Sequence, residues 1–97
     1  MIRSFADEPA AAVWADGPAS ALRRVPPEVR ARARRKLAVL HSAESLDAVG
    51  ALPGTRLEAL RGDLAGFWSI RVNDQWRIVF RWTKGEAADV RLLDYHD

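Results

Sequence analysis

The sequence predicts an α+β domain, in which a strand and helices come first and a mainly antiparallel sheet follows, with the helices packed on one face of the sheet. Two observations support this class. Apolar residues recur at helical spacing in the first half of the chain, whereas in the second half they alternate with polar residues, as in strands with one buried face. No repeat or low-complexity segment interrupts this order, so we expect residues 1–97 to form a single domain.

The chain is predicted to begin with a short strand at residues 2–5 and a short helix at residues 8–14. Pro9 lies in the first turn of that helix, where proline is tolerated because the first backbone N–H groups have no partner within the helix. The segment 15–18, Ala-Asp-Gly-Pro, ends the helix.

The main helix is predicted to begin within residues 25–28 and to extend to about Leu40. Two prolines suit the first helical positions, and the acid that follows them suits the positive end of the helix dipole. Ser45 is the expected cap of a further helical turn at residues 46–49, which Gly50 ends. The predicted buried stripe of the main helix consists of Val29, Ala33, Leu37 and Leu40.

The clearest structural signal is a pair of alternating segments at residues 67–72 and 76–82. For the apolar residues of both segments to face one core, paired positions must sum to an even number, because a slip of one residue turns a strand over. This register leaves residues 73–75 as a three-residue hairpin loop. The predicted pairs are Val72 with Trp76, Ile70 with Ile78, and Trp68 with Phe80.

Two further segments complete the predicted sheet. Residues 57–60 begin it, and the glycines that follow turn the chain into the first alternating segment. Residues 90–95 form the last strand, after a hairpin loop at residues 83–86. The helices cover one face of this sheet, and the other face is expected to stay open.

The predicted register places Arg71 opposite Arg77 on the open face. Like charges that are directly opposed destabilise a sheet, so stability alone would not select this arrangement. Two explanations remain open at this point: carboxylate partners within the protein, or a ligand that carries phosphate.

The composition is that of a folded globule without disulfides. Of its 97 residues, 48% are hydrophobic and none is cysteine, which argues against disorder and excludes thiolate metal sites. No apolar run approaches the ~20 residues that span a bilayer, and charged residues come too early for a secretory leader. We therefore expect a cytoplasmic protein that does not bind membranes.

Positive charge is concentrated in one part of the chain, although the net charge is only +2. Residues 23–36 contain seven cations and one acid, whereas residues 86–97 contain four acids and one arginine. A basic segment of this kind is compatible with a polyanionic partner. It is equally compatible with a solvated helix face.

Seven side chains near the ends of the sheet are candidates for chemistry. They are Arg61, Arg71, Arg77, Arg81, Asp94, Tyr95 and His96. Metal-free RNA cleavage requires assistance to the attacking ribose 2′-OH, stabilisation of charge on the phosphate oxygens, and assistance to the departing 5′ oxygen. Arginine suits the second task, and histidine is the natural acid or base near neutrality. Tyrosine can donate a proton, position a group or stack on a base.

Each candidate also has a structural explanation, and His41, after the main helix, is assigned no role. The structural alternatives are an ion pair of Arg71 with Asp94 or Asp63, a solvated Arg81, a Tyr95 ring that caps the core, and a His96 in a frayed tail.

Three stretches of the sequence, LEALRGD, GFWSIRVNDQWRIVFRW and the closing DYH, strongly resemble HigB-type toxins of the RelE/ParE superfamily. These toxins belong to type II toxin–antitoxin systems and include plasmid maintenance system killer proteins. The resemblance covers nearly the whole chain. It implies a RelE-like fold and a ribosome-dependent mRNA endonuclease, which cuts the message in the ribosomal A site by 2′-OH attack without a metal or other cofactor.

The resemblance also implies which residues form the active site. The arginine of the WRI segment matches Arg77, and the basic residue before Gly-Asp matches Arg61; the closing Asp-Tyr-His matches Asp94, Tyr95 and His96. In these toxins lysine is common at the position that matches Arg61. Arg61 keeps the charge but is a poorer proton donor, so we expect it to stabilise charge. Strand alternation predicts that Tyr95 shares a face with Arg77 and that His96 points toward the core side.

The implied partners are a HigA-like helix-turn-helix antitoxin, the ribosome with its mRNA, and operator DNA reached through the toxin–antitoxin complex. Further contacts with RNA phosphates are expected from Arg71, Arg81, Arg30, Arg34 and Arg35. Two other functions stay open, a ParE-like gyrase-inhibiting toxin and a non-catalytic RNA- or protein-binding module on the same fold.

Overall fold

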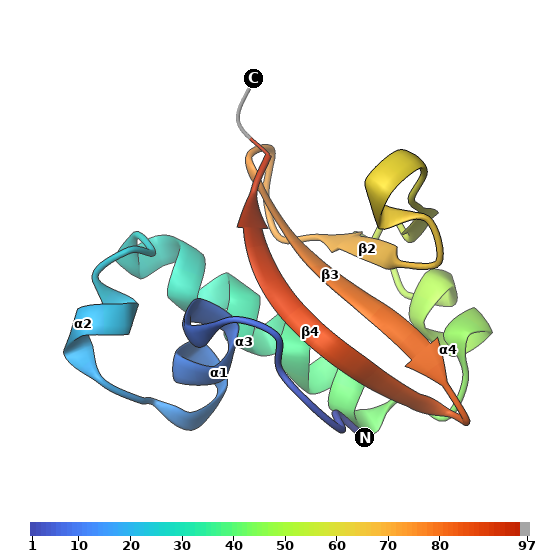
Figure 1. Cartoon of the computed structure of the whole chain (residues 1–97), viewed down its shortest axis with the longest axis horizontal. Coiled ribbons are helices and arrows are strands. Elements are labelled where there is room, and N and C mark those ends of the chain that lie inside the picture. The colour runs from blue at the N-terminus through green and yellow to red at the C-terminus, as the bar shows by residue number, and fades with distance from the viewer. Residues whose placement is uncertain (96–97) are drawn as a thin grey trace.

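The computed structural model describes residues 1–95 and shows N-terminal helices packed on a four-stranded antiparallel sheet (Figure 1). This is the α+β architecture that the sequence predicts. The helices are α1 (Glu8–Ala15), α2 (Ala19–Leu22), α3 (Pro27–Ser42) and α4 (Leu46–Ala51). The strands are β1 (Glu58–Ala59), β2 (Trp68–Arg71), β3 (Trp76–Thr83) and β4 (Glu86–Asp94), and a 3₁₀ turn, η1 (Gly62–Leu64), connects β1 to β2.

Asp7 joins α1 to the sheet. One of its carboxylate oxygens, Oδ1, accepts a hydrogen bond of 2.9 Å from the N–H of Ala10 and so caps the helix. The other, Oδ2, accepts one of 3.1 Å from the N–H of Leu92 in β4. Burial raises the pKa of the Asp7 carboxyl, although these two hydrogen bonds and the charge of Arg91 act to lower it.

The main helix has the predicted start and the predicted buried stripe. Pro26 precedes α3, Pro27 is its first residue, and Val29, Ala33, Leu37 and Leu40 are all buried. The Ser45 hydroxyl accepts from the N–H of Ala48 at 3.1 Å, as expected of a cap. The predicted end of that turn at Gly50 is wrong, because α4 continues to Ala51. The sequence also gave no sign of the single turn α2.

The register of the β2–β3 hairpin is confirmed. Trp68 pairs with Phe80, Ile70 with Ile78, and Arg71 with Arg77. The N–H of Val72 donates to the carbonyl of Trp76 at 2.9 Å, which completes the predicted pairing. The Asn73 side chain closes the loop, since its Oδ1 accepts from the N–H groups of Gln75 and Trp76 at 2.9 and 2.7 Å.

Two expectations at the β4 side of the sheet were wrong. β4 begins at Glu86 rather than at residue 90, and its pairing with β3 shifts between Val79 and Arg81, next to Asp89 with a left-handed φ of 51°. Residues 2–5 form no regular strand. They lie parallel to β4 and contact it through two isolated bridges, Ile2 with Ala87 and Phe5 with Val90.

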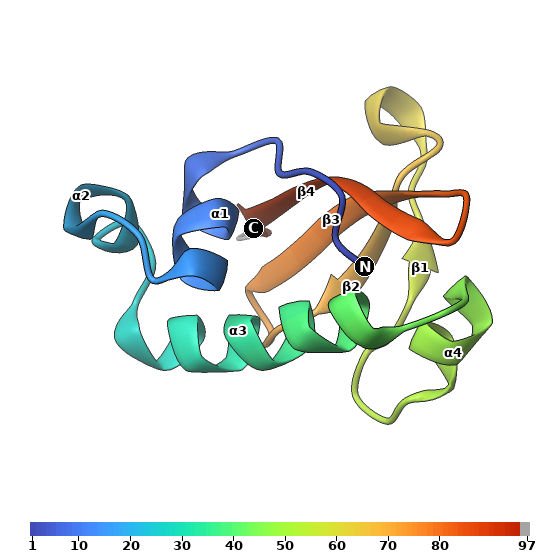
Figure 2. The same ribbon diagram turned by 90° about the horizontal axis from the view of Figure 1, so that it is seen from below.

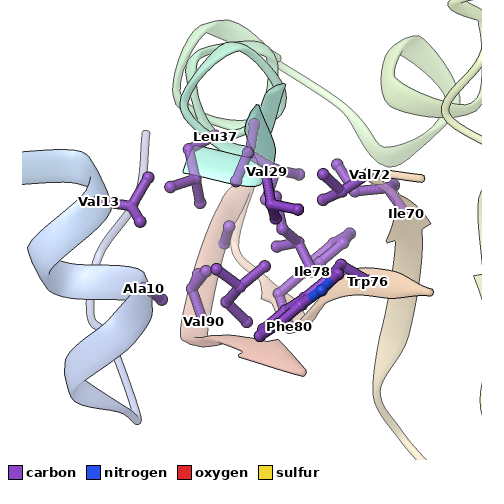
Figure 3. Packing of buried hydrophobic residues seen from close by; sticks show 14 of the residues in the cluster. Ala10, Val13, Val29, Leu37, Ile70, Val72, Trp76, Ile78, Phe80 and Val90 are labelled. Carbon is purple, nitrogen blue, oxygen red and sulfur yellow. The ribbon is translucent and has the colours of Figure 1, made fainter. Parts of the chain in front are cut away.

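The core lies between α3 and one face of the sheet, and α1 closes one side of it (Figures 2 and 3). Leu37 and Val29 of α3 point toward the strands, where the apolar even-numbered positions of β3 meet them. Trp76 is 8% exposed and Phe80 is fully buried. Trp68 and Trp82, at the other end of the strands, are only half-buried and pack against the cluster. The even-numbered face therefore forms the core, as predicted.

Candidate active site

The face of the sheet opposite α3 is less open than the sequence predicts. No surface of Ser69 or Val79 is exposed, although both side chains belong to this face. In the sheet, Val79 lies between Ser69 of β2 and Arg91 of β4, and Arg77 and Arg81 flank it along its own strand. The aliphatic stems of arginine can cover apolar surface while the charged ends reach solvent. The centre of this face is thus dry, and its rim is cationic.

Arg77 is the most constrained cation of this face. Its side chain is only 18% exposed. One guanidinium nitrogen, NH1, donates to the Ser69 hydroxyl at 2.9 Å, and the other, NH2, lies 3.5 Å from a carboxylate oxygen of Glu58 in β1. The guanidinium carbon lies 6.0 Å from the centre of the Tyr95 ring, within the range of a cation–π contact. Arg77 is therefore positioned from three elements before any ligand binds.

Carboxylates within the protein account for the opposed arginines. Arg77 pairs with Glu58, and Arg71 forms an ion pair and hydrogen bond with Asp74 in the hairpin loop. The expected partners of Arg71, Asp94 and Asp63, were therefore wrong. The side chains of Asp74 and Glu58 are 95% and 58% exposed. Ion pairs exposed to this degree contribute little stability, so an incoming phosphate can replace these carboxylates at small cost.

Tyr95 and Asp94 lie on different sides of the sheet. Asp94 pairs with Trp76, a core-facing residue, whereas Tyr95 follows on the face of Arg77, as the alternation predicts. Both are tied to the hairpin loop. The Tyr95 N–H donates to the Gln75 carbonyl, and the Gln75 side-chain nitrogen donates to Asp94 Oδ2 at 3.2 Å. The Tyr95 ring is 39% exposed, so it does not cap the core.

Phe67 organises the other end of this face. The guanidinium carbons of Arg81 and Arg91 each lie 4.9 Å from the centre of its ring. Arg81 also lies 3.8 Å from a carboxylate oxygen of Asp89, and 55% of its side chain is exposed. The expectation of a merely solvated Arg81 is therefore too simple, because two contacts hold its guanidinium.

Arg61 and His96 are the remaining sequence candidates. Arg61 is exposed and lies immediately before η1. Its side chain forms no ion pair within residues 1–95. His96 lies outside the described residues, so the predicted direction of its side chain stays a prediction.

The arginines of α3 that were expected to bind RNA lie in different surroundings. Arg30 is half-buried, and its Nε donates to the carbonyl of Val25 at 2.8 Å. Arg34 borders a hollow on the α1 side of the helix, together with Asp16. Arg35 borders a cleft on the opposite side, between α3 and the β2–β3 loop.

That cleft is strongly cationic. Its volume is about 320 Å³. It is lined by Arg32, Arg35, Lys36, Gly54, Arg71, Val72 and Asn73. Four of these seven residues are cations and none is an acid.

Sequence reasoning missed four residues that organise the sheet face, namely Glu58, Ser69, Phe67 and Arg91. The period-two pattern contained a usable signal for Ser69 and Phe67, because both occupy odd positions of the β2 segment, on the side of Arg77. Glu58 required knowledge of the β1–β2 register. Alternation in the last strand also placed Arg91 on this face, because it pairs with Val79 before the register shifts.

Neither a metal centre nor a membrane segment is evident in the described chain. Residues 1–95 contain no group of three or more His, Asp or Glu side chains placed to hold a metal ion. Over the same residues, the helices are too short and too polar to cross a bilayer. The sheet face itself carries cationic groups that can bind an anion, and the exposed Tyr95 lies beside Arg77.

The fold and this face define a small α+β protein whose sheet carries a rim of arginines on the side opposite α3. Comparison with known proteins narrows the class. Residues 3–96 match the family described as the RelE-like toxin of type II toxin–antitoxin system HigB. The chain belongs to this family, which implies an antitoxin partner.

Individual relatives agree with this assignment. Over 74 residues the chain is 39% identical to Toxin HigB-1 of Vibrio cholerae serotype O1, covering 76% of this chain and 77% of the relative. Over 41 residues it is 44% identical to Endoribonuclease HigB of Proteus vulgaris, covering 42% and 45% of the two chains. The fold resembles a chain of the YoeB–YefM complex from Staphylococcus aureus, with a TM-score of 0.60, 17% identity and coverage of 100% and 99%. The resemblance inferred from the sequence is thereby confirmed.

Proposed function

We propose that the protein is a ribosome-dependent mRNA endonuclease, the toxin of a type II toxin–antitoxin pair, which cuts mRNA in the ribosomal A site. The observation that carries this proposal is the environment of Arg77. A guanidinium fixed by Ser69 and Glu58 beside the exposed Tyr95 ring is a preorganised cation for a phosphate that gains charge. Membership of the HigB-like family and the name of the Proteus vulgaris relative support the same activity.

The proposed reaction is attack of a ribose 2′-OH on the adjacent phosphorus. The P–O bond to the 5′ oxygen breaks, and the products are a 2′,3′-cyclic phosphate and a 5′-OH end. Arg77 stabilises the charge of the transition state, with Arg61 as a further source of positive charge. Tyr95 and His96 serve proton transfer or hold the substrate, and Asp94, which already binds Gln75, orients the C-terminal segment. No metal or organic cofactor takes part.

The proposed setting is the cytoplasm, where translating ribosomes are found. The partner is a helix-turn-helix antitoxin of the HigA type, and the pair together binds operator DNA. The basic surface of α3, with Arg30, Arg34 and Arg35, and the sheet residues Arg71 and Arg81 supply further contacts to RNA phosphates.

The test is a translation reaction with a defined mRNA, in which the 5′ ends are mapped by primer extension. Wild-type protein should cut within codons only while ribosomes translate. Arg77→Ala should lower kcat by about two to three orders of magnitude, as loss of one preorganised donor does elsewhere. Arg23→Ala removes an exposed arginine outside the site and serves as the matched control.

The same experiment separates the alternatives. An intact message together with gyrase-linked DNA breaks in cells would identify a ParE-like gyrase inhibitor. If neither effect occurred, the chain would be a binding module on a toxin fold.

A further inference from the structure

The cationic cleft, formed by α3, the segment before β1 and the β2–β3 loop, is separate from the contacts that hold Arg77. Three of its cations, Arg32, Arg35 and Lys36, come from adjacent turns of α3, and the fourth, Arg71, comes from the end of β2. Residues three and four apart lie on one side of a helix, so these three side chains are directed toward the same loop. Arg71 is paired with the exposed Asp74, whereas the three helix cations have no acid among the lining residues. These three repel one another, and the repulsion is relieved when an anion binds.

The walls of the cleft are held in place by backbone contacts. The Lys36 ammonium donates to the carbonyl of Gly54 at 3.3 Å, which links α3 to the segment before β1. The N–H of Arg71 donates to the carbonyl of Thr55 at 2.7 Å, which links the same segment to β2. The Asn73 side-chain oxygen is occupied by the loop, which directs its amide nitrogen, a donor, to other partners. Lys36 and the backbone of Arg71 are thus held in place before a ligand arrives.

Arg71 connects this cleft with the candidate active site. It is the direct cross-strand partner of Arg77, on the same face of the sheet. The two guanidinium groups have different partners, Ser69 for Arg77 and Asp74 for Arg71, so each can contact a different phosphate. Arg71 is 31% exposed, and its only ion-pair partner within residues 1–95 is the highly exposed Asp74. A strand whose phosphate contacts Arg77 can therefore place its next phosphates on Arg71 and in the cleft.

We propose that this cleft binds the phosphate backbone of RNA and so forms a second anion site beside the candidate active site. The proposal deepens the function proposed above and rests on it for the identity of the ligand. Its ligand class is consecutive phosphodiesters of a single-stranded segment, contacted by Arg32, Lys36 and Arg71. Arg34 and Arg30 lie outside it and do not define it.

The first test measures binding and cleavage on programmed ribosomes with matched variants. Arg32→Gln/Lys36→Gln removes two cleft cations, and Arg23→Gln/Arg24→Gln removes two exposed cations elsewhere. The cleft variant should bind about ten-fold more weakly, and the control should lose less than about two-fold. Equal losses in the two would show that only net charge matters and would overturn the proposal. Thermal melts of both variants verify that each is folded.

Shortened messages identify which RNA occupies the cleft. If the cleft binds the message, then removal of the nucleotides on one side of the cut should abolish the difference between wild type and the cleft variant. If the difference persists with every shortened message, the cleft binds a phosphate segment of ribosomal RNA instead.

The second test does not depend on cleavage. A short single-stranded RNA with 2′-O-methyl riboses, which cannot be cut, is titrated into ¹⁵N-labelled protein. The amide signals of Gly54 and Asn73 should move together, and that of Asp16, on the α1 side, should not. Shifts spread evenly over the protein would overturn the proposal. If these shifts occur but the wild type cuts no message, the cleft stands and the nuclease assignment fails.

Discussion

Arg77 is held by one neutral and one charged partner, and these have different consequences for an anion. The Ser69 hydroxyl fixes the direction of the guanidinium without offsetting its charge, and this serine is fully buried. Glu58 lies on the exposed rim and competes with a phosphate for the same nitrogen atom. The contact with Ser69 therefore favours phosphate binding at Arg77, and the contact with Glu58 weakens it.

Glu58→Gln should therefore strengthen binding to mRNA-programmed ribosomes by about two- to five-fold, because it removes a competing charge while Ser69 still orients Arg77. The free energy of unfolding should change by less than about 0.5 kcal/mol, since the ion pair is exposed. Equilibrium binding and urea denaturation measure the two effects. Asp47→Asn removes an exposed acid in α4 and is the control. Weaker binding of Glu58→Gln would mean that the part of Glu58 in positioning Arg77 outweighs its competition with phosphate.

Asp7 leads to a prediction about pH. Because burial raises the pKa of its carboxyl, the folded state binds the proton more tightly than the unfolded state does. The stability that this group contributes is complete below its unfolded pKa and is lost as pH rises through the higher, folded pKa. Asp7→Asn abolishes this dependence on pH. The asparagine side chain has only one oxygen for the N–H groups of Ala10 and Leu92, so the free energy of unfolding should also fall by about 1–2 kcal/mol. Urea denaturation at acidic and neutral pH should show the wild-type advantage shrinking as pH rises. If the difference in stability between wild type and Asp7→Asn did not change with pH, the raised pKa of Asp7 would be contradicted.

At the scale of elements, the hairpin was predictable and the β4 side was not. The β2–β3 register followed from period two and a short loop, because a slip would have exposed its apolar side chains. Ala87, Ala88 and Asp89 have low strand propensity and resemble a loop. In the structure they join β4 because Ala87 and Ala88 pair with β3 on one side and the N-terminal segment contacts Ala87 on the other. Contacts that span nearly the whole chain leave no local pattern in the sequence.

The β3–β4 turn has a conformation that glycine favours at both central positions. Lys84 and Gly85 have φ values of 51° and 79°, and Thr83 pairs with Glu86, as in a two-residue hairpin turn. Gly85→Ala should lower the free energy of unfolding by about 1–2 kcal/mol. The cause is backbone strain and not a steric clash, since the added Cβ would meet nothing closer than 3.9 Å. Lys84→Asn should raise the free energy of unfolding, because asparagine tolerates a positive φ better than lysine does. Urea unfolding of both variants tests the pair, and effects of the same sign would exclude this explanation.

At the scale of the whole molecule, sequence reasoning identified some residues of the sheet face but did not identify the cleft. Arg71, Arg77 and Tyr95 share one face, as alternation within strands predicts. The cleft depends on how α3 docks against the hairpin loop, and this docking brings Arg32 near Arg71, far along the chain. The basic run of the sequence predicted positive charge on the helix. It could not show which of its arginines borders the loop.

The distribution of charge predicts that salt acts on binding and on folding differently. The three ion pairs within residues 1–95 each include a side chain that is at least 47% exposed, so they contribute little to stability. The three phosphate contacts proposed for the cleft should by themselves weaken RNA binding about twenty-fold when potassium chloride rises from about 50 to about 200 mM, because bound counterions are released. Over the same range Tm should move by less than about 2 °C. Filter binding to programmed ribosomes and thermal melts at matched salt concentrations measure the two responses. A parallel fall in Tm would mean that ion pairs hold the fold, and salt-independent binding would mean that phosphate contacts do not dominate recognition.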